Sequence, residues 1–114
     1  MNKLSLLLTA SAFATSAAAQ TPQGSVERGQ EAYMGKFCYS CHGTVGQGGE
    51  RGAGPKLAPH PFPYEGFAQQ IRRPRAEMPR YPVEFLSDRE LADIYAYVAS
   101  IKSRTAKEIP LLHD

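Results

Sequence analysis

The stretch that decides the fold is Cys38-Tyr39-Ser40-Cys41-His42, which contains both cysteines of the 114-residue chain. A disulfide between two cysteines this close in sequence would close a very short loop. Such a bond restrains little of the unfolded chain, because its stabilising effect grows with loop length. The two thiols are therefore expected to take part in chemistry rather than to stabilise the fold as a disulfide.

The spacing fits the Cys-x-x-Cys-His pattern for covalent attachment of haem. The two thiols add to the vinyl groups of the porphyrin, and a gap of two residues lets both sulfurs reach one edge of the ring. The adjacent histidine is then held under the iron, where an imidazole nitrogen can bind it. The pattern predicts one covalently bound haem c, attached through Cys38 and Cys41, with His42 as an iron ligand.

Two other uses of a Cys-x-x-Cys pair are weaker. A thioredoxin-like redox motif belongs beside a βαβ pattern, which this sequence lacks. A structural zinc site needs two further well-placed ligands. The remaining histidines, His60 and His113, are far apart and have no paired spacing.

The first residues read as a secretory signal peptide, residues 1–19, with Lys3 before an apolar run and small residues at the end. Cleavage after Ala19 would leave one domain, residues 20–114, in the periplasm, where haem attachment of this kind takes place. An uncleaved membrane anchor is the alternative, but the apolar run is shorter than the roughly 20 residues that span a bilayer. No later segment could span one, and a net charge of +2 gives no support for nucleic-acid binding.

A first helix is predicted for residues 26–37, with Ser25 capping its first turn. Residues 43–63 are rich in glycine and proline, which excludes a stable regular element there. A loop this long inside a compact domain usually has a function, such as wrapping a ligand. A short helix is predicted for residues 64–73, where Pro74 ends it.

The last helix has the clearest start, a capping box formed by Ser87 and Glu90. Apolar residues at helical spacing carry it to about Lys102: Leu91, Ile94, Tyr95, Val98 and Ile101. Tyr95 and Tyr97 cannot share one face, and the stripe favours Tyr95 as the inward one. No pair of alternating strands is visible, so the predicted fold class is all-α. It has about three main helices and long Gly/Pro-rich loops around one haem.

Met78 is the best candidate for the second axial position of the iron. Pro79 favours an extended backbone at Met78, so the side chain can project from a strap across the haem face. A methionine among charged neighbours is also a poor core residue. Met34 is a weaker candidate, and His60 would give the iron two histidine ligands.

These features together resemble the small class I cytochromes c over Gly29 to about Lys102. The resemblance rests on Cys38–His42, Gly54-Pro55-Lys56-Leu57, Met78-Pro79 and the aromatic last helix. It implies the cytochrome c fold, and it implies that the carbonyl of Pro55 binds the second nitrogen of His42. It further implies that the first and last helices cross, with Gly29 and Tyr33 meeting Leu91 and Tyr95.

Four basic residues surround the predicted strap: Arg72, Arg73, Arg75 and Arg80. One interpretation is a solvated surface. The other is pairing with the haem propionates, or docking to an acidic partner near the haem edge. The resemblance suggests that one of these arginines or Tyr81 contacts a propionate.

An iron bound by both histidine and methionine has no open position for a substrate, and methionine raises its reduction potential. The predicted function is therefore periplasmic one-electron transfer rather than catalysis. The expected donor is a dehydrogenase, and the expected acceptor is an oxidase or a larger cytochrome. The protein would be a monomer or part of a hetero-complex, such as the cytochrome subunit of a flavin or quinoprotein dehydrogenase. The competing class of function is a haem enzyme or gas sensor with an open iron. A third class is a purely structural subunit.

Overall fold

The computed structural model describes residues 21–49, 53–59 and 62–102. The predicted signal peptide, His60 and His113 lie outside these ranges. The described residues form four helices and no strand, which confirms the all-α prediction. No described helix has the length and apolar character needed to cross a membrane.

The first helix, α1, spans Val26–Gly35 and ends two residues earlier than predicted. A short helix, α2, spans Tyr39–His42 within the cysteine motif. Helix α3 spans Tyr64–Arg72, and α4 spans Asp88–Ser100. The three predicted helices are therefore confirmed, and α2 is a turn of helix that the sequence pattern did not reveal.

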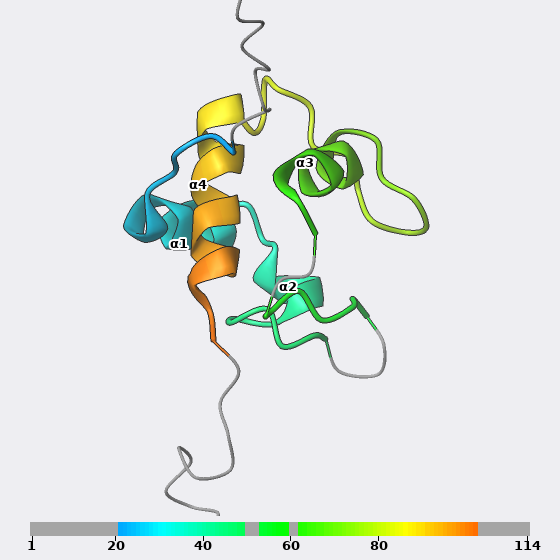
Figure 1. Cartoon of the computed structure of the whole chain (residues 1–114). Helices are drawn as coiled ribbons and strands as arrows, with labels where there is room; N and C mark the ends of the chain where they lie inside the picture. Colours follow the sequence, from blue (N-terminus) through cyan, green and yellow to red (C-terminus); the bar gives the residue numbers. More distant parts are fainter. Residues whose placement is uncertain (1–20, 50–52, 60–61, 103–114) are drawn as a thin grey trace, which may run out of the picture.

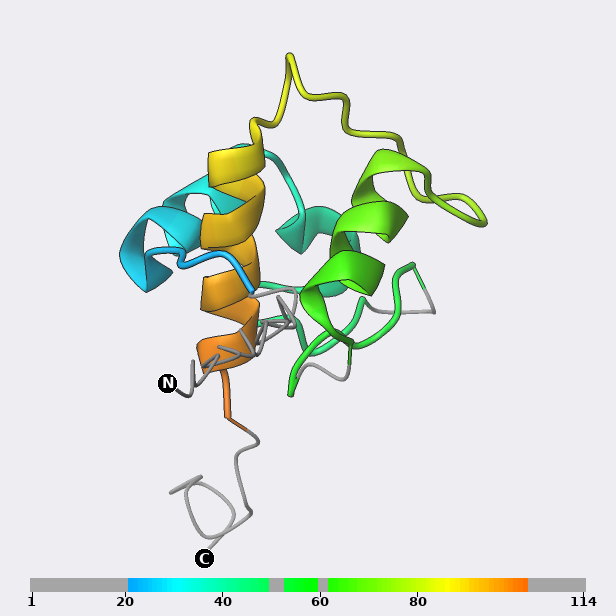
Figure 2. The same cartoon turned by 45° about the horizontal axis from the view of Figure 1, so that its top comes forward.

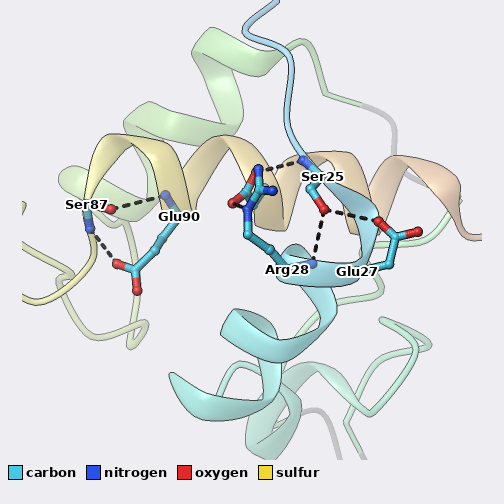
Figure 3. A network of polar contacts seen from close by, with 6 residues as sticks. Ser25, Glu27, Arg28, Ser87 and Glu90 are labelled. Carbon is cyan, nitrogen blue, oxygen red and sulfur yellow. Dashed lines mark hydrogen bonds and ion pairs between the residues drawn. The ribbon is translucent and has the colours of Figure 1, made fainter.

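Side-chain caps begin both long helices (Figure 3). The Ser25 hydroxyl accepts a hydrogen bond from the Arg28 amide in α1. At α4, Ser87 and Glu90 form the predicted capping box, in which each side chain accepts from the backbone N–H of the other. Such a cap stabilises a helix by about 1 kcal/mol, because it satisfies amides that have no partner within the helix.

Helices α1 and α4 cross and pack tightly, while α3 lies on the other side of α4 (Figures 1 and 2). The crossing depends on Gly29, because an added Cβ there would overlap the Asp93 carbonyl. The Asp93 carboxylate, which is buried, accepts two hydrogen bonds from the Arg28 guanidinium at 2.9 and 3.0 Å and one from the Ser25 amide at 2.7 Å. The first and last parts of the domain are thus joined by backbone contact and by charge.

The tyrosine that meets α1 is Tyr97, so the prediction that Tyr95 meets α1 is wrong. The Tyr97 ring is 6% exposed and packs edge-on against Tyr33, with 5.3 Å between ring centroids. Tyr95 turns toward α3, where it contacts the rings of Tyr64 and Phe67. Both sides of α4 are covered, so one apolar stripe could not identify the side that faces α1.

The core gathers around α4. Its buried members are Tyr33, Phe67, Ile71, Leu86, Leu91, Ile94, Tyr97 and Val98. Burying a large apolar side chain contributes about 1.5–3 kcal/mol. These residues come from α1, α3, α4 and the turn before α4. The core therefore holds these helices in place relative to one another, beside the cleft described below.

Candidate functional site

A cleft of about 1260 Å³ opens beside this core. It exceeds the roughly 300–1000 Å³ of ordinary ligand pockets. Its walls come from α2, α3, the glycine-rich loop after α2 and the segment between α3 and α4, which arches away from the helices (Figure 2). All five site residues predicted from the sequence line this one cleft: Cys38, Cys41, His42, Pro55 and Met78.

The segment Cys38–His42 lies on the wall because α2 is anchored by the helix pair. The Tyr33 hydroxyl of α1 donates to the Gly43 carbonyl at 2.6 Å, directly after His42. The Tyr97 hydroxyl of α4 donates to the Thr44 carbonyl at 2.9 Å. The crossing of α1 and α4 thus positions the turn that follows the predicted iron ligand.

Cys38 is partly buried and Cys41 is exposed. Burial raises the pKa of the Cys38 thiol to about 11. A redox-active Cys-x-x-Cys pair needs the opposite, a lowered thiol pKa that supplies the reactive thiolate. The environment of Cys38 therefore disfavours the thioredoxin-like alternative.

His42 is 8% exposed, and its Nδ1 atom lies 2.8 Å from the Pro55 carbonyl oxygen. A carbonyl can only accept, so Nδ1 carries the proton and Nε2 keeps its lone pair. This arrangement fixes both the tautomer and the ring orientation, as is usual for histidines that bind metals. Gly54 allows the approach, since a Cβ there would meet the Cys41 carbonyl and lie 3.1 Å from Nδ1.

Met78 lies in the segment between α3 and α4 and is partly buried against the core. Its sulfur Sδ accepts a contact from Nε2 of Gln70 on α3 at 3.8 Å. No sequence pattern pointed to Gln70, because its partners lie in an irregular segment. Met34, the weaker candidate, is 39% exposed on α1 and does not line the cleft. The other candidate, His60, lies outside the described residues.

The basic cluster divides in two. Arg72 has a structural role, because it joins α3 to the start of α4 and to the segment before it. Its guanidinium binds Asp88 at 2.7 Å and the carbonyls of Tyr81 and Leu86 at 2.9 and 2.6 Å. Its interpretation as a propionate or partner contact is therefore not favoured. The other three arginines line the cleft, are exposed, and make no ion pair with a described residue: Arg73, Arg75 and Arg80. Tyr81 donates its hydroxyl to the Lys36 carbonyl at 3.2 Å.

The residues present fit a haem. The cleft is large and mostly apolar, two thiols lie three positions apart on its wall, and one imidazole there has its metal-binding nitrogen preset. No group of three or more His, Cys, Asp or Glu side chains among the described residues could hold a bare metal ion. An all-α fold with such a cleft and such a motif defines a c-type cytochrome.

Residues 24–98 match the family described as cytochrome c oxidase, cbb3-type, subunit III. The match covers well over half of the chain, so the protein belongs to this family of cytochrome c domains. Comparisons with curated proteins and with solved structures gave no significant match. Membership implies covalently bound haem c with its iron, and electron transfer as the activity.

Proposed function

We propose that the protein is a periplasmic one-electron carrier with a single haem c. Cys38 and Cys41 would form the two thioethers, and His42 and Met78 would bind the iron. The observation that supports this assignment is the 2.8 Å contact between His42 Nδ1 and the Pro55 carbonyl, which leaves the lone pair of Nε2 available to bind a metal. The haem supplies a ferrous/ferric couple, and the residues of this chain hold it, shield it and set its potential.

The surroundings of the cleft support docking of a redox partner. Arg73, Arg75 and Arg80 give the cleft a positive rim, with Glu77 as an acidic member. Phe37 and Phe62 are 61% and 57% exposed along the same cleft. An acidic partner surface would be steered by the arginines and would pack on the phenylalanines. The proposed donor is a dehydrogenase, and the proposed acceptor is an oxidase or another cytochrome.

Met78→Ala tests the ligand assignment, and Met34→Ala is a matched control on the exposed side of α1. The wild-type ferric protein should show the weak red-edge absorption band of a methionine–iron bond. Met78→Ala should keep its haem, lose the band, bind carbon monoxide readily when reduced, and have a lower potential. Met34→Ala should behave as the wild type. A wild type that lacks the band and binds carbon monoxide readily would instead support an open-site haem enzyme or sensor.

Replacing both cysteines tests the attachment. Protein with Cys38→Ala and Cys41→Ala should lose all its haem to acidified acetone, whereas the wild type should retain it. Haem that resists extraction from the double variant would contradict the attachment.

The mass of the exported protein checks the signal peptide, since cleavage after Ala19 predicts a chain that begins at Gln20.

The family description names an oxidase subunit, which favours a second candidate. The protein would then be a stable cytochrome subunit of a larger redox enzyme, such as a flavin or quinoprotein dehydrogenase. Gel filtration of native periplasmic extract separates the two. A free carrier elutes as a small monomer, and a subunit elutes with its enzyme.

A further inference from the structure

Gln70 makes three contacts with the segment that carries Met78. Its Nε2 donates to the Arg75 carbonyl at 3.2 Å and contacts Met78 Sδ at 3.8 Å. Its Oε1 accepts the Arg75 amide at 3.4 Å. Gln70 is partly buried on the last turn of α3, so one rigid helix residue holds both the backbone of the segment and the sulfur.

The backbone between these contacts needs such support. Ala76 has φ +62°, in the left-handed region that is unfavourable for any residue except glycine. A backbone of this kind persists only where its surroundings enforce it. The two bonds from Gln70 to Arg75 fix the residue directly before Ala76, and Ala76 then directs the chain toward Met78.

The far end of the same segment is anchored to α3 as well. The Tyr81 amide donates to the Ile71 carbonyl at 3.1 Å, and the Arg72 guanidinium binds the Tyr81 carbonyl at 2.9 Å. Three consecutive residues of α3 therefore hold the segment: Gln70, Ile71 and Arg72. Of these three, Gln70 is the one that makes a hydrogen bond to the sulfur.

We propose that Gln70 is a positioning residue for Met78, holding its sulfur toward the iron and donating a hydrogen bond to it. This inference rests on the proposed role of Met78 as an axial ligand. A thioether sulfur has two lone pairs, so one can bind iron while the other accepts the amide N–H. The hydrogen bond withdraws electron density from the sulfur, which weakens its donation to ferric iron and raises the reduction potential.

The test uses holoprotein with Gln70→Leu, which removes all three contacts at similar size. Gln30→Leu on α1 is the control, because Gln30 is exposed, does not line the cleft, and its side chain makes no hydrogen bond to a described residue. Gln70→Glu is a second variant that keeps the acceptor for the Arg75 amide but cannot donate to sulfur. Each protein is measured for reduction potential, for the red-edge band and for imidazole binding to the ferric form.

We expect Gln70→Leu to lower the potential, weaken the band and tighten imidazole binding by about tenfold. Imidazole must displace Met78, and losing hydrogen bonds that hold the ligand increases the fraction of open iron. Gln70→Glu should also lower the potential, and Gln30→Leu should match the wild type. If Gln70 had only a structural role, Gln70→Leu would lower the melting temperature and leave the potential, the band and imidazole binding unchanged. A folded Gln70→Leu holoprotein with unchanged potential, band and imidazole affinity would overturn the inference.

Met78→Ala separates this inference from the ligand assignment beneath it. If Met78→Ala leaves the band and potential unchanged, Met78 is not a ligand, and both ideas are wrong. If Met78→Ala opens the iron while Gln70→Leu changes nothing, only the role of Gln70 is wrong. In the double variant, Gln70→Leu should add no further change in imidazole affinity. A tenfold effect that persists without Met78 would also contradict the proposal.

Discussion

The Nδ1 atom of His42 lies 2.8 Å from the carbonyl oxygen of Pro55, across a loop whose approach depends on Gly54. A Cβ at position 54 would lie 2.5 Å from the Cys41 carbonyl oxygen, so the loop would have to move away. We expect Gly54→Ala to lengthen the bond from His42 to Pro55 and to weaken the fixed orientation of the imidazole. The measurement is the ferric absorption spectrum together with the reduction potential.

The control for Gly54→Ala is Gly35→Ala, at the end of α1, where an added Cβ meets nothing within 4 Å. Both variants should attach haem, but only Gly54→Ala should change the potential. Equal potentials in the two variants would show that the Pro55 contact does not influence the iron.

The helix crossing gives a prediction for stability. In Gly29→Ala the added Cβ would overlap the Asp93 carbonyl and lie 2.9 Å from Cβ of Tyr97. This steric clash would force α1 and α4 apart. We expect a loss of about 3 kcal/mol or more in the free energy of unfolding, measured with urea. Gly35→Ala should change it by less than about 1 kcal/mol, in the stabilising direction, because alanine favours helix. Equal stability of the two variants would contradict the close crossing.

The Tyr33 hydroxyl gives a second test of the helix pair. Tyr33→Phe removes the hydroxyl donor to the Gly43 carbonyl, which then keeps only the hydrogen bond from the Gly46 amide, and this should cost about 1 kcal/mol. Tyr95→Phe removes an exposed hydrogen bond to the Phe62 carbonyl and should cost less than about 0.5 kcal/mol. Urea unfolding of both variants checks the order. A larger cost for Tyr95→Phe would contradict the role of the Tyr33 hydroxyl in anchoring the turn after His42.

Asp93 should make stability depend on pH. The hydrogen bond from Arg28, with weaker help from the Ser25 amide and Arg89, lowers the pKa of the Asp93 carboxyl. A carboxyl with a lowered folded-state pKa stabilises the fold above its ordinary pKa of about 4. That contribution is lost as the pH falls through the folded-state value. Asp93→Asn should therefore be clearly less stable than the wild type at neutral pH.

The difference between wild type and Asp93→Asn should shrink as the pH falls below about 4, where the wild-type carboxyl also becomes neutral. Circular dichroism during urea unfolding at several pH values measures it. A difference that stays constant down to about pH 2 would show that the charge of Asp93 is not what Arg28 stabilises.

Much of the fold could be predicted because its signals are local. The capping box at Ser87 and the proline after α3 fixed element ends within one or two residues. Helix α2 was missed because four residues show no periodicity. Tyr97 was missed because α4 is covered on both sides, so its apolar stripe does not distinguish α1 from α3.

The candidate site shows the same division. The cysteine motif and Met78-Pro79 could be proposed as site residues because their chemistry is carried by adjacent residues, and they all line the cleft. The roles of Gln70 and Arg72 depend on a segment that turns back onto α3 through a left-handed alanine. Propensities do not predict such a turn. The sequence therefore did not distinguish Arg72, which has a structural role, from the other three arginines of the cluster.

The joining of α1 to α4 also has a consequence for the order of maturation. The Ser25 amide and the Asp93 carboxylate are 68 positions apart, so this contact closes most of the domain into one loop. Closing a loop this long costs chain entropy, so contacts of such long range slow the folding of a chain. Cys38 is partly buried against the core of the folded chain, whereas a thiol must be accessible to add to a vinyl group. We therefore expect the porphyrin to be joined to an open chain, which then closes around it.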